Sequence, residues 1–202
     1  MPRLSLSLAM SEYAHVRDIQ LGRVVPEGID LRLSSPPLEE MFRRFSAEEA
    51  WDVAEMSTGM YAALRANGDE RFTAIPVFLS RIFRQSSVYV VSGGPIRAPE
   101  DLAGKRIGIP NWFQTAIIYV RGWLSDDVGL DLRKISWVQA GVDAPTHRPP
   151  ADIALPAGFS LEQVADRSLS EMLAAGEIEA LVASHAPSPP PGSSVRFARL
   201  IE

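Results

Sequence analysis

The sequence predicts an α/β protein of two lobes with mostly parallel sheets. Strand-like runs alternate with short helical segments from the N-terminus onward, which is typical of βαβ units. The stretch from Phe72 to Thr115 then supplies two β-rich runs, Phe72–Leu79 and Ser86–Val91, separated by an arginine-bearing link. We expect this stretch to join the lobes and to form the floor of a cleft between them.

Changes in the alternation of strands and helices indicate the domain boundaries. We expect a first α/β lobe at residues 1–87, a second α/β lobe at residues 88–190, and a return segment or tail at residues 191–202. The run Pro187–Pro191 marks the last boundary, because proline interrupts both helices and strands.

Strands and helices alternate through the first lobe. Leu4 and Leu6 alternate with Ser5 and Ser7, which indicates the first strand. The expected strands are Arg3–Met10, Ile29–Leu33, Trp51–Met56 and Phe72–Leu79. The first expected helix is capped by Ser11 and ended by Gly22. The second starts at Pro36-Pro37, and its apolar face consists of Leu38, Met41, Phe42 and Phe45. The third is Met60–Ala66.

The same alternation continues in the second lobe. A strand at Arg106–Ile109 stops at Pro110-Asn111 and opens into a helix at Trp112–Leu124. Ser168 begins the run Ser-Leu-Ser-Glu, which predicts a serine-capped helix start. The further expected elements are strands at Ile135–Val138 and Ala180–Ala183 and a proline-rich loop over residues 143–158.

Composition excludes several classes of function. The 202 residues are 46% hydrophobic and 22% charged, which is ordinary for a globular protein. The net charge of −5 and the lack of a basic cluster argue against a nucleic-acid partner. All but Lys105 and Lys134 of the 20 basic residues are arginines, which suits carboxylate binding or merely reflects base composition.

Neither disulfides nor a membrane partner is expected. The chain has no cysteine, so thiolate metal sites and cysteine nucleophiles are excluded. The N-terminal run MPRLSLSLAM reads as a strand and not as a signal peptide, and no apolar run is long enough for a transmembrane helix. We therefore expect a cytoplasmic protein.

Polar residues follow several of the predicted strands. In parallel sheets ligands bind beyond the carboxyl ends of the strands. This rule selects the region of Ser11–Tyr13 after the first strand, Glu55–Thr58 after the third and Ser80–Gln85 after the fourth. We expect these segments to converge on one crevice, with Tyr13, Ser57 and Thr58 as substrate contacts.

Two residues are candidate proton donors. Glu55 ends a predicted central strand, and a partly buried carboxyl there can donate a proton. Its alternative role is to neutralise an arginine such as Arg81. His15 in the first helix is the other candidate, although a lone histidine is more often structural. The three histidines, His15, His147 and His185, have no metal-ligand spacing, and we expect no metal, although histidines and carboxylates could still converge in space.

Anion-binding groups are expected from arginines and helix starts. Arg81 and Arg84 lie in the link between two strands and can form bidentate hydrogen bonds to carboxylates, or alternatively salt bridges between the lobes. The turn before the second lobe's first helix offers backbone N–H groups to an anion. Asn111, Gln114 and Thr115 are the candidate side chains there, with plain helix capping as the alternative.

Several segments form an ordered set over nearly the whole chain. They are Gly22–Val24, Pro26–Leu31, Phe42–Arg44, Trp51–Ser57, Ala74–Phe78, Ser80–Arg84, Asp101–Pro110, Thr115, Arg121-Gly122 and Leu173–Leu181. This set resembles the 4,5-dihydroxyphthalate decarboxylase family, which is similar in fold to two-lobed type II periplasmic binding proteins. The resemblance departs at Gln85, where a histidine is expected, and at Asn111, where a glutamate is expected.

The resemblance implies a decarboxylase of an aromatic dicarboxylic acid that works by ring protonation and loss of CO₂, without a cofactor. Glu55 or His15 would be the acid, and Arg81 and Arg84 would bind the anion, so Arg84 also counts among the catalytic candidates. Family members are longer and continue past the segment matching Val195–Leu200, so we expect an incomplete first lobe or a fragment.

Fold alone does not separate catalysis from binding. The alternative hypothesis is a non-catalytic cytosolic module that binds a small organic anion. A homo-oligomer is compatible with either reading.

Overall fold

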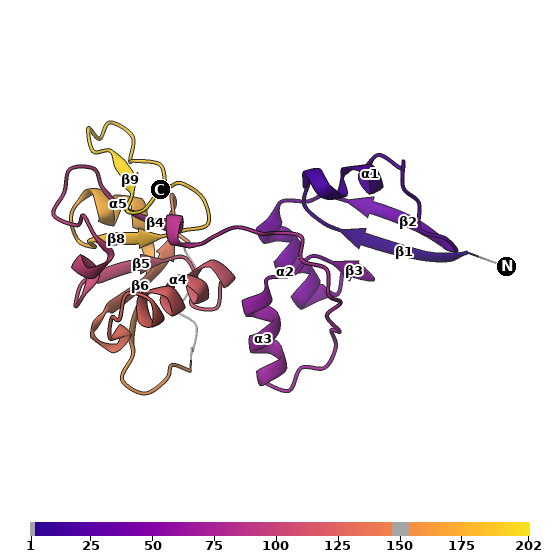
Figure 1. Ribbon diagram of the computed structural model, residues 1–202, viewed down its shortest axis with the longest axis horizontal. Coiled ribbons are helices and arrows are strands. Elements are labelled where there is room, and N and C mark those ends of the chain that lie inside the picture. The colour runs from indigo at the N-terminus through magenta and orange to yellow at the C-terminus, as the bar shows by residue number, and fades with distance from the viewer. Residues whose placement is uncertain (1–2, 147–153) are drawn as a thin grey trace. The chain divides into compact units, whose positions relative to one another are not determined.

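The computed structural model describes residues 3–146 and 154–202 and confirms the mixed α/β class with mostly parallel sheets. The chain divides into two compact units, Met1–Ile82 and Phe83–Glu202, each with its own sheet (Figure 1). No helix in the described part of the chain combines the length and apolar character needed to cross a membrane.

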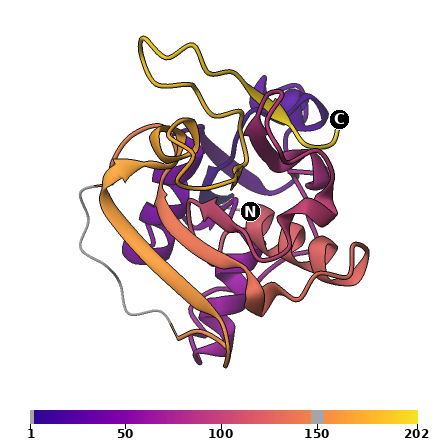
Figure 2. The ribbon, with the colours of Figure 1, turned by 90° about the vertical axis from the view of Figure 1, so that its left-hand side faces the viewer.

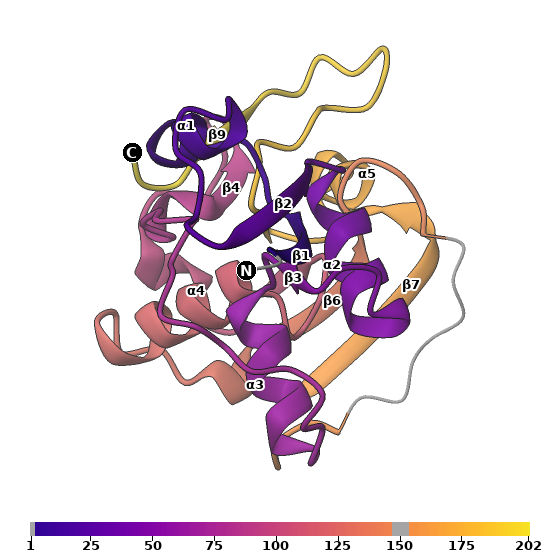
Figure 3. The ribbon, with the colours of Figure 1, turned by 90° about the vertical axis from the view of Figure 1, so that its right-hand side faces the viewer.

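The first unit is built on a three-stranded parallel sheet of order β2-β1-β3 (Figure 3). Its strands are β1 (Leu4–Ala9), β2 (Ile29–Ser34) and β3 (Val53–Ala54). Its helices are η1 (Ala14–Val16), α1 (Arg17–Gln20), α2 (Leu38–Glu48) and α3 (Thr58–Ala66), with η1 a 3-10 turn. The central strand β1 pairs with β2 over its full length, from Leu4 opposite Ile29 to Ala9 opposite Ser34.

The apolar face of α2 supplies much of the core of this unit. Met41 is fully buried and Phe45 nearly so, as their helical spacing predicts. Phe45 also packs on Phe72, with ring centroids 4.9 Å apart. Leu38, at the start of the helix, stays exposed, so the buried stripe is narrower than predicted.

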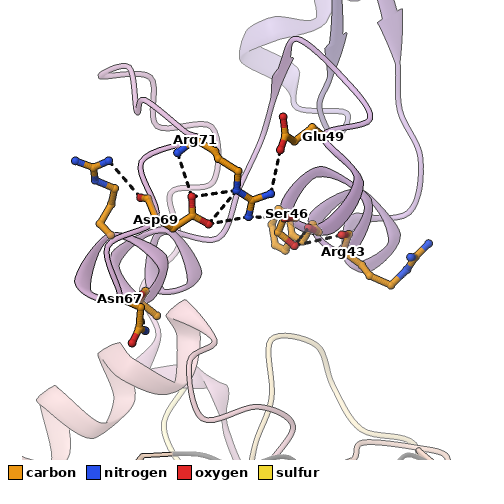
Figure 4. Close-up of polar contacts among 9 residues, drawn as sticks. Arg43, Ser46, Glu49, Asn67, Asp69 and Arg71 are labelled. Carbon is orange, nitrogen blue, oxygen red and sulfur yellow. Dashed lines mark hydrogen bonds and ion pairs between the residues drawn. The ribbon is translucent and has the colours of Figure 1, made fainter.

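Arg71 ties the ends of α2 and α3 together (Figure 4). Its guanidinium donates to the Asp69 carboxylate just beyond α3, at 2.7 Å, and to the Glu49 carboxylate at 3.0 Å and the Ser46 carbonyl at 3.1 Å at the end of α2. Glu49 itself is the left-handed C-cap of α2, with φ of 50°. Because these ion pairs are exposed to solvent, they add little to the free energy of unfolding, and their role is to fix the two helix ends.

The predicted strand Trp51–Met56 is wrong in length, because only Val53–Ala54 pairs with β1. Just before β3, the Asp52 carboxylate accepts hydrogen bonds from the Ser7 N–H at 2.8 Å and from the Ser7 hydroxyl at 2.7 Å. The Ser7 N–H, which a longer β1–β3 pairing would use, is therefore bonded to a side chain. The same hydrogen bonds lower the pKa of Asp52.

The first helix starts later than predicted. Ser11 is not its N-cap, since η1 begins at Ala14 after Tyr13, and the α-helical part is only Arg17–Gln20. The backbone N–H of Ser11 is instead donated to the Glu55 carboxylate.

The fourth strand predicted at Phe72–Leu79 is not formed. Pro76 lacks an N–H, and the chain bends around it, with the Val77 N–H donating to the Ile75 carbonyl at 2.7 Å. Ile75, Val77 and Phe78 are each more than half exposed. The apolar pattern was strand-like, but this segment pairs with no described strand.

The second unit holds a six-stranded sheet of order β7-β6-β5-β8-β4-β9. Strands β5 to β8 run parallel to one another, whereas β4 is antiparallel to both β8 and β9. The strands are β4 (Val88–Val91), β5 (Arg106–Ile109), β6 (Ser136–Gly141), β7 (Ser160–Ser168), β8 (Ala180–Val182) and β9 (Phe197–Arg199). The helical elements are η2 (Gln85–Ser87), η3 (Pro99–Leu102), α4 (Thr115–Asp126), η4 (Leu132–Lys134) and α5 (Leu169–Ala174).

Two hydrophobic clusters occupy the two faces of this sheet. Successive strand residues alternate between them, as side chains do in a pleated strand. Ile107 and Trp137 pack with Ile117 and Leu124 of α4, whereas Val138 packs with residues of α5. Gly108 faces α5 so closely that a Cβ there would lie 2.8 Å from a terminal methyl of Leu169, which would have to move to admit a larger residue.

Sequence reasoning missed β7, the long edge strand shown in orange in Figure 2. Its charges, including Glu162, Asp166 and Arg167, interrupt the apolar alternation. An edge strand with one neighbour tolerates such charges, and they protect its open side from further pairing.

The serine-capped start of α5 is confirmed. Ser168 accepts from the Glu171 N–H, and Glu171 accepts from the Ser168 N–H, which is a capping box.

Candidate functional site

A hydrogen-bonded cluster lies at the carboxyl ends of β1 and β3. Because these strands are parallel neighbours, the residues that follow them meet at one edge of the sheet. The Tyr13 hydroxyl donates to Glu55 Oε1 at 2.6 Å, and the Ser11 N–H donates to Glu55 Oε2 at 3.1 Å. The Glu55 N–H in turn donates to the Ala9 carbonyl at 2.9 Å, which fixes the backbone that carries the carboxylate.

The environment of Tyr13 makes its hydroxyl a persistent donor. Burial raises its pKa to about 12, with the hydrogen bond to Glu55 and the charge of that carboxylate adding to the shift. Hydrogen bonds with Ser11 and Ser80 act in the opposite direction. The phenol therefore stays protonated at neutral pH and holds Glu55 in place.

Ser80 brings the third predicted segment to this cluster. Its contact with Tyr13 places the chain after Phe72–Leu79 beside the ends of β1 and β3, although no strand leads there. Ser11, Tyr13, Glu55 and Ser80 thus lie together within the first unit. One crevice formed by all of Ser11–Tyr13, Glu55–Thr58 and Ser80–Gln85 stays a prediction.

His15 lies on the outer side of the cluster. Its ring stacks on the Tyr13 ring, with centroids 5.5 Å apart and planes 29° apart, and its side chain is exposed. His15 can therefore reach solvent or a ligand, while Glu55 is held inward by two donors.

Ser57 and Thr58 lie two and three residues after Glu55. Ser57 is the N-cap of α3, where its hydroxyl accepts from the Met60 N–H at 3.4 Å, so the capping role is present. Thr58 is the first residue of the helix and is exposed. A role for either in substrate binding stays a prediction.

The two candidate arginines differ in their surroundings. Arg81 is exposed, and its Nε donates to the Phe78 carbonyl at 3.0 Å. Glu55 pairs with Ser11 and Tyr13, so neutralisation of Arg81 by Glu55 does not occur among the described residues. Arg84 belongs to the second unit, where it precedes η2, and η2 packs against α4.

The turn between β5 and α4 is longer than predicted, because the helix begins at Thr115 and not at Trp112. Asn111 closes this turn: its side chain accepts from the Phe113 N–H at 2.8 Å, and its carbonyl accepts from the Gln114 N–H at 3.2 Å. The Trp112 N–H donates to the Gln139 side chain at 2.8 Å. These amides are therefore not open to an anion, which corrects the expectation of free N–H groups here.

Arg121 is a residue that sequence reasoning did not select as a site residue. It lies on α4 beside the buried Val120, and its guanidinium packs 3.8 Å from the centre of the Trp112 ring. One nitrogen donates to the Trp112 carbonyl at 3.0 Å. Its place four residues after the buried Ile117, on the apolar face of the helix, is the signal that the sequence offers.

No group of three or more potential metal ligands occurs among residues 3–146 and 154–202. His185, after β8, lies 3.7 Å from Asp143, after β6, and the Asp143 carboxylate also accepts from the Ser188 N–H. His147 lies outside the described residues.

Both units therefore carry polar groups at the carboxyl ends of parallel strands, which is where α/β proteins bind small ligands.

No protein-family model matches the chain. Two curated relatives do: the 4,5-dihydroxyphthalate decarboxylases of Comamonas testosteroni, 38% identical, and of Pseudomonas putida, 35% identical, both over 93% of this chain. The chain belongs to the 4,5-dihydroxyphthalate decarboxylase family. It spans 57% of the length of the Comamonas relative and 73% of that of the Pseudomonas relative.

Solved structures are similar only at low scores. A protein of Archaeoglobus fulgidus matches with a TM-score of 0.46 and 16% identity, over 90% of this chain and 54% of its own. A probable amino-acid ABC transporter extracellular-binding protein of Bacillus subtilis matches with a TM-score of 0.41 and 10% identity, over 98% of this chain and 78% of its own.

Proposed function

We propose that the protein acts as a carboxy-lyase on an aromatic dicarboxylic acid such as 4,5-dihydroxyphthalate. The observation that carries this proposal is the identity of 35% and 38% to two 4,5-dihydroxyphthalate decarboxylases over 93% of the chain. The Tyr13–Glu55 pair at the carboxyl ends of two strands supports it by offering a fixed carboxyl group at a ligand-binding position.

The reaction sets two chemical requirements. The bond between the ring carbon and one carboxylate breaks, CO₂ leaves, and the electron pair stays on the ring carbon, which takes up a proton. The hydroxyl para to that carbon donates electron density when the ring is protonated. The protein must therefore supply a proton at the ring carbon and bind the carboxylate that remains.

Glu55 is the residue proposed for the first requirement, as the acid that delivers a proton to the ring carbon. Two donors, the Ser11 N–H and the Tyr13 hydroxyl, fix the orientation of its carboxyl group. His15 is the alternative donor, from the exposed side of Tyr13.

The second requirement would be met by arginines and by polar groups at helix starts. Arg81 and Arg84 are the proposed partners of the carboxylates, through paired N–H donors. Ser57, Thr58, Asn111, Gln114 and Thr115 are the proposed positioning donors, with Tyr13 beside the acid.

The test is to incubate the purified protein with 4,5-dihydroxyphthalate and to measure CO₂ release and the formation of protocatechuate. Phthalate, which lacks the hydroxyls, serves as the control substrate and should not react. Turnover that disappears in Glu55→Gln but persists in Glu12→Gln supports the proposal, since Glu12 is an exposed carboxylate on the same segment as Tyr13. Binding of 4,5-dihydroxyphthalate without turnover at high protein concentration would show instead a binding module.

A further inference from the structure

We propose that Arg121 provides the charge that binds a carboxylate at the β5–α4 turn of the second unit. The proposal does not use the backbone amides of this turn, because those of Trp112, Phe113 and Gln114 already have partners. It rests on the proposed function only for the choice of an aromatic carboxylate as ligand.

Arg121 is a largely buried cation without a counter-ion. No carboxylate among the described residues forms an ion pair with it, and its Nη1 atom is buried without a hydrogen-bond partner among them. Burial alone lowers its pKa to about 10, with no opposing negative charge, so it remains charged at neutral pH. Buried charges are normally paired, because an unpaired one costs free energy.

Three arginines of the second unit give a contrast. Arg106, Arg133 and Arg167 each pair with a carboxylate, although all three are considerably exposed and need a partner less. Arg121 is more buried than these three and has no carboxylate partner among the described residues. A ligand anion would supply the missing charge and recover part of the cost of burial.

Neighbouring groups position this charge under the turn. The Trp112 ring lies against the guanidinium, and the Trp112 carbonyl accepts from it at 3.0 Å, which holds the cation beneath residues 111–114. Asn111 and Phe113, on the same turn, are exposed, so a ligand can approach it.

The site therefore selects for negative charge. We expect it to take the carboxylate of an aromatic acid. Arg121 would act through its charge, and the exposed residues of the turn would make the outer contacts.

The experiment measures the binding of benzoate, phthalate and benzamide to the full chain by calorimetry and thermal shift. The wild-type protein should bind benzoate and phthalate but not benzamide, which has the same shape without the charge. In Arg121→Met the affinity for phthalate should fall at least tenfold, whereas Arg121→Lys should stay within about threefold of the wild type. Arg133→Met, which removes an exposed and ion-paired arginine of the same unit, is the matched control and should bind normally.

Three results would overturn the proposal. They are no phthalate binding by the wild type, equal binding of benzamide and benzoate, and an Arg121→Lys variant that loses as much affinity as Arg121→Met, which would assign the effect to packing on Trp112. The first two comparisons use the wild-type protein and remain decisive if Arg121→Met does not fold. Charge-dependent phthalate binding without turnover of 4,5-dihydroxyphthalate would support this site while contradicting the proposed reaction.

Discussion

The Tyr13 hydroxyl donates a 2.6 Å hydrogen bond to Glu55, joining residues 42 positions apart at the carboxyl ends of two neighbouring parallel strands. A phenol that stays protonated is paired with a carboxylate that also accepts a backbone N–H. The pair combines a carboxyl group with a fixed orientation.

Tyr13→Phe should destabilise the first unit and lower turnover. The variant keeps the ring that stacks on His15 but leaves Glu55 Oε1 without its donor. A hydrogen bond to a charged group contributes about 1.5–3 kcal/mol, so the free energy of unfolding should fall by about that amount. Urea denaturation measures the loss, and steady-state assays should show a lower kcat. Unchanged stability and kcat would mean that the hydrogen bond is unimportant.

The pH dependence of stability should carry a component from Tyr13. Its pKa is about 12 in the folded protein and about 10 in the unfolded chain, so the folded state holds its proton more tightly. The stability that this provides is complete below pH 10 and is lost as the pH rises from 10 to 12. Urea melts across this range should fall more steeply for the wild type than for Tyr13→Phe, and parallel curves would contradict the assignment.

Glu55→Gln should abolish most of the proposed activity. The amide has the size of the carboxyl but cannot donate a proton in the reaction, and general acid catalysis contributes roughly 10²–10⁴-fold. The kcat for 4,5-dihydroxyphthalate should therefore fall by about that factor. A loss below threefold would move the acid role to another residue, and His15→Asn is the variant to examine next.

Ser168→Ala should destabilise the second unit without changing ligand binding. Ser168 is fully buried, and its hydroxyl accepts from the Glu171 N–H at 3.2 Å at the start of α5. Loss of such a cap costs about 1–2 kcal/mol. Thermal or urea unfolding measures the change. Ser170→Ala removes only the hydroxyl that lies 3.3 Å from Ser168, and it should cost less.

Local patterns predicted a good part of the fold correctly. The alternation of Leu and Ser gave β1, Arg106–Ile109 matches β5 residue for residue, and Ser168 caps α5 as expected. Each of these depends on hydrogen bonds or on side-chain alternation within a few residues. The candidate residues Tyr13 and Glu55 were also found from the sequence, because residues that follow parallel strands gather at one edge of a sheet.

What the sequence alone determined, then, is where strands and helices can form and which polar residues follow them. The tertiary structure decided which of these segments pair with a neighbouring strand and which charged side chains form ion pairs. Phe72–Leu79 has the pattern of a strand but no neighbouring strand, while β7 becomes a strand because β6 offers its open edge. The same holds for charges: Arg71 is paired and Arg121 is not, and only the folded chain shows this. The reason is that the partners of strands and ions come from distant parts of the chain, which no local pattern specifies.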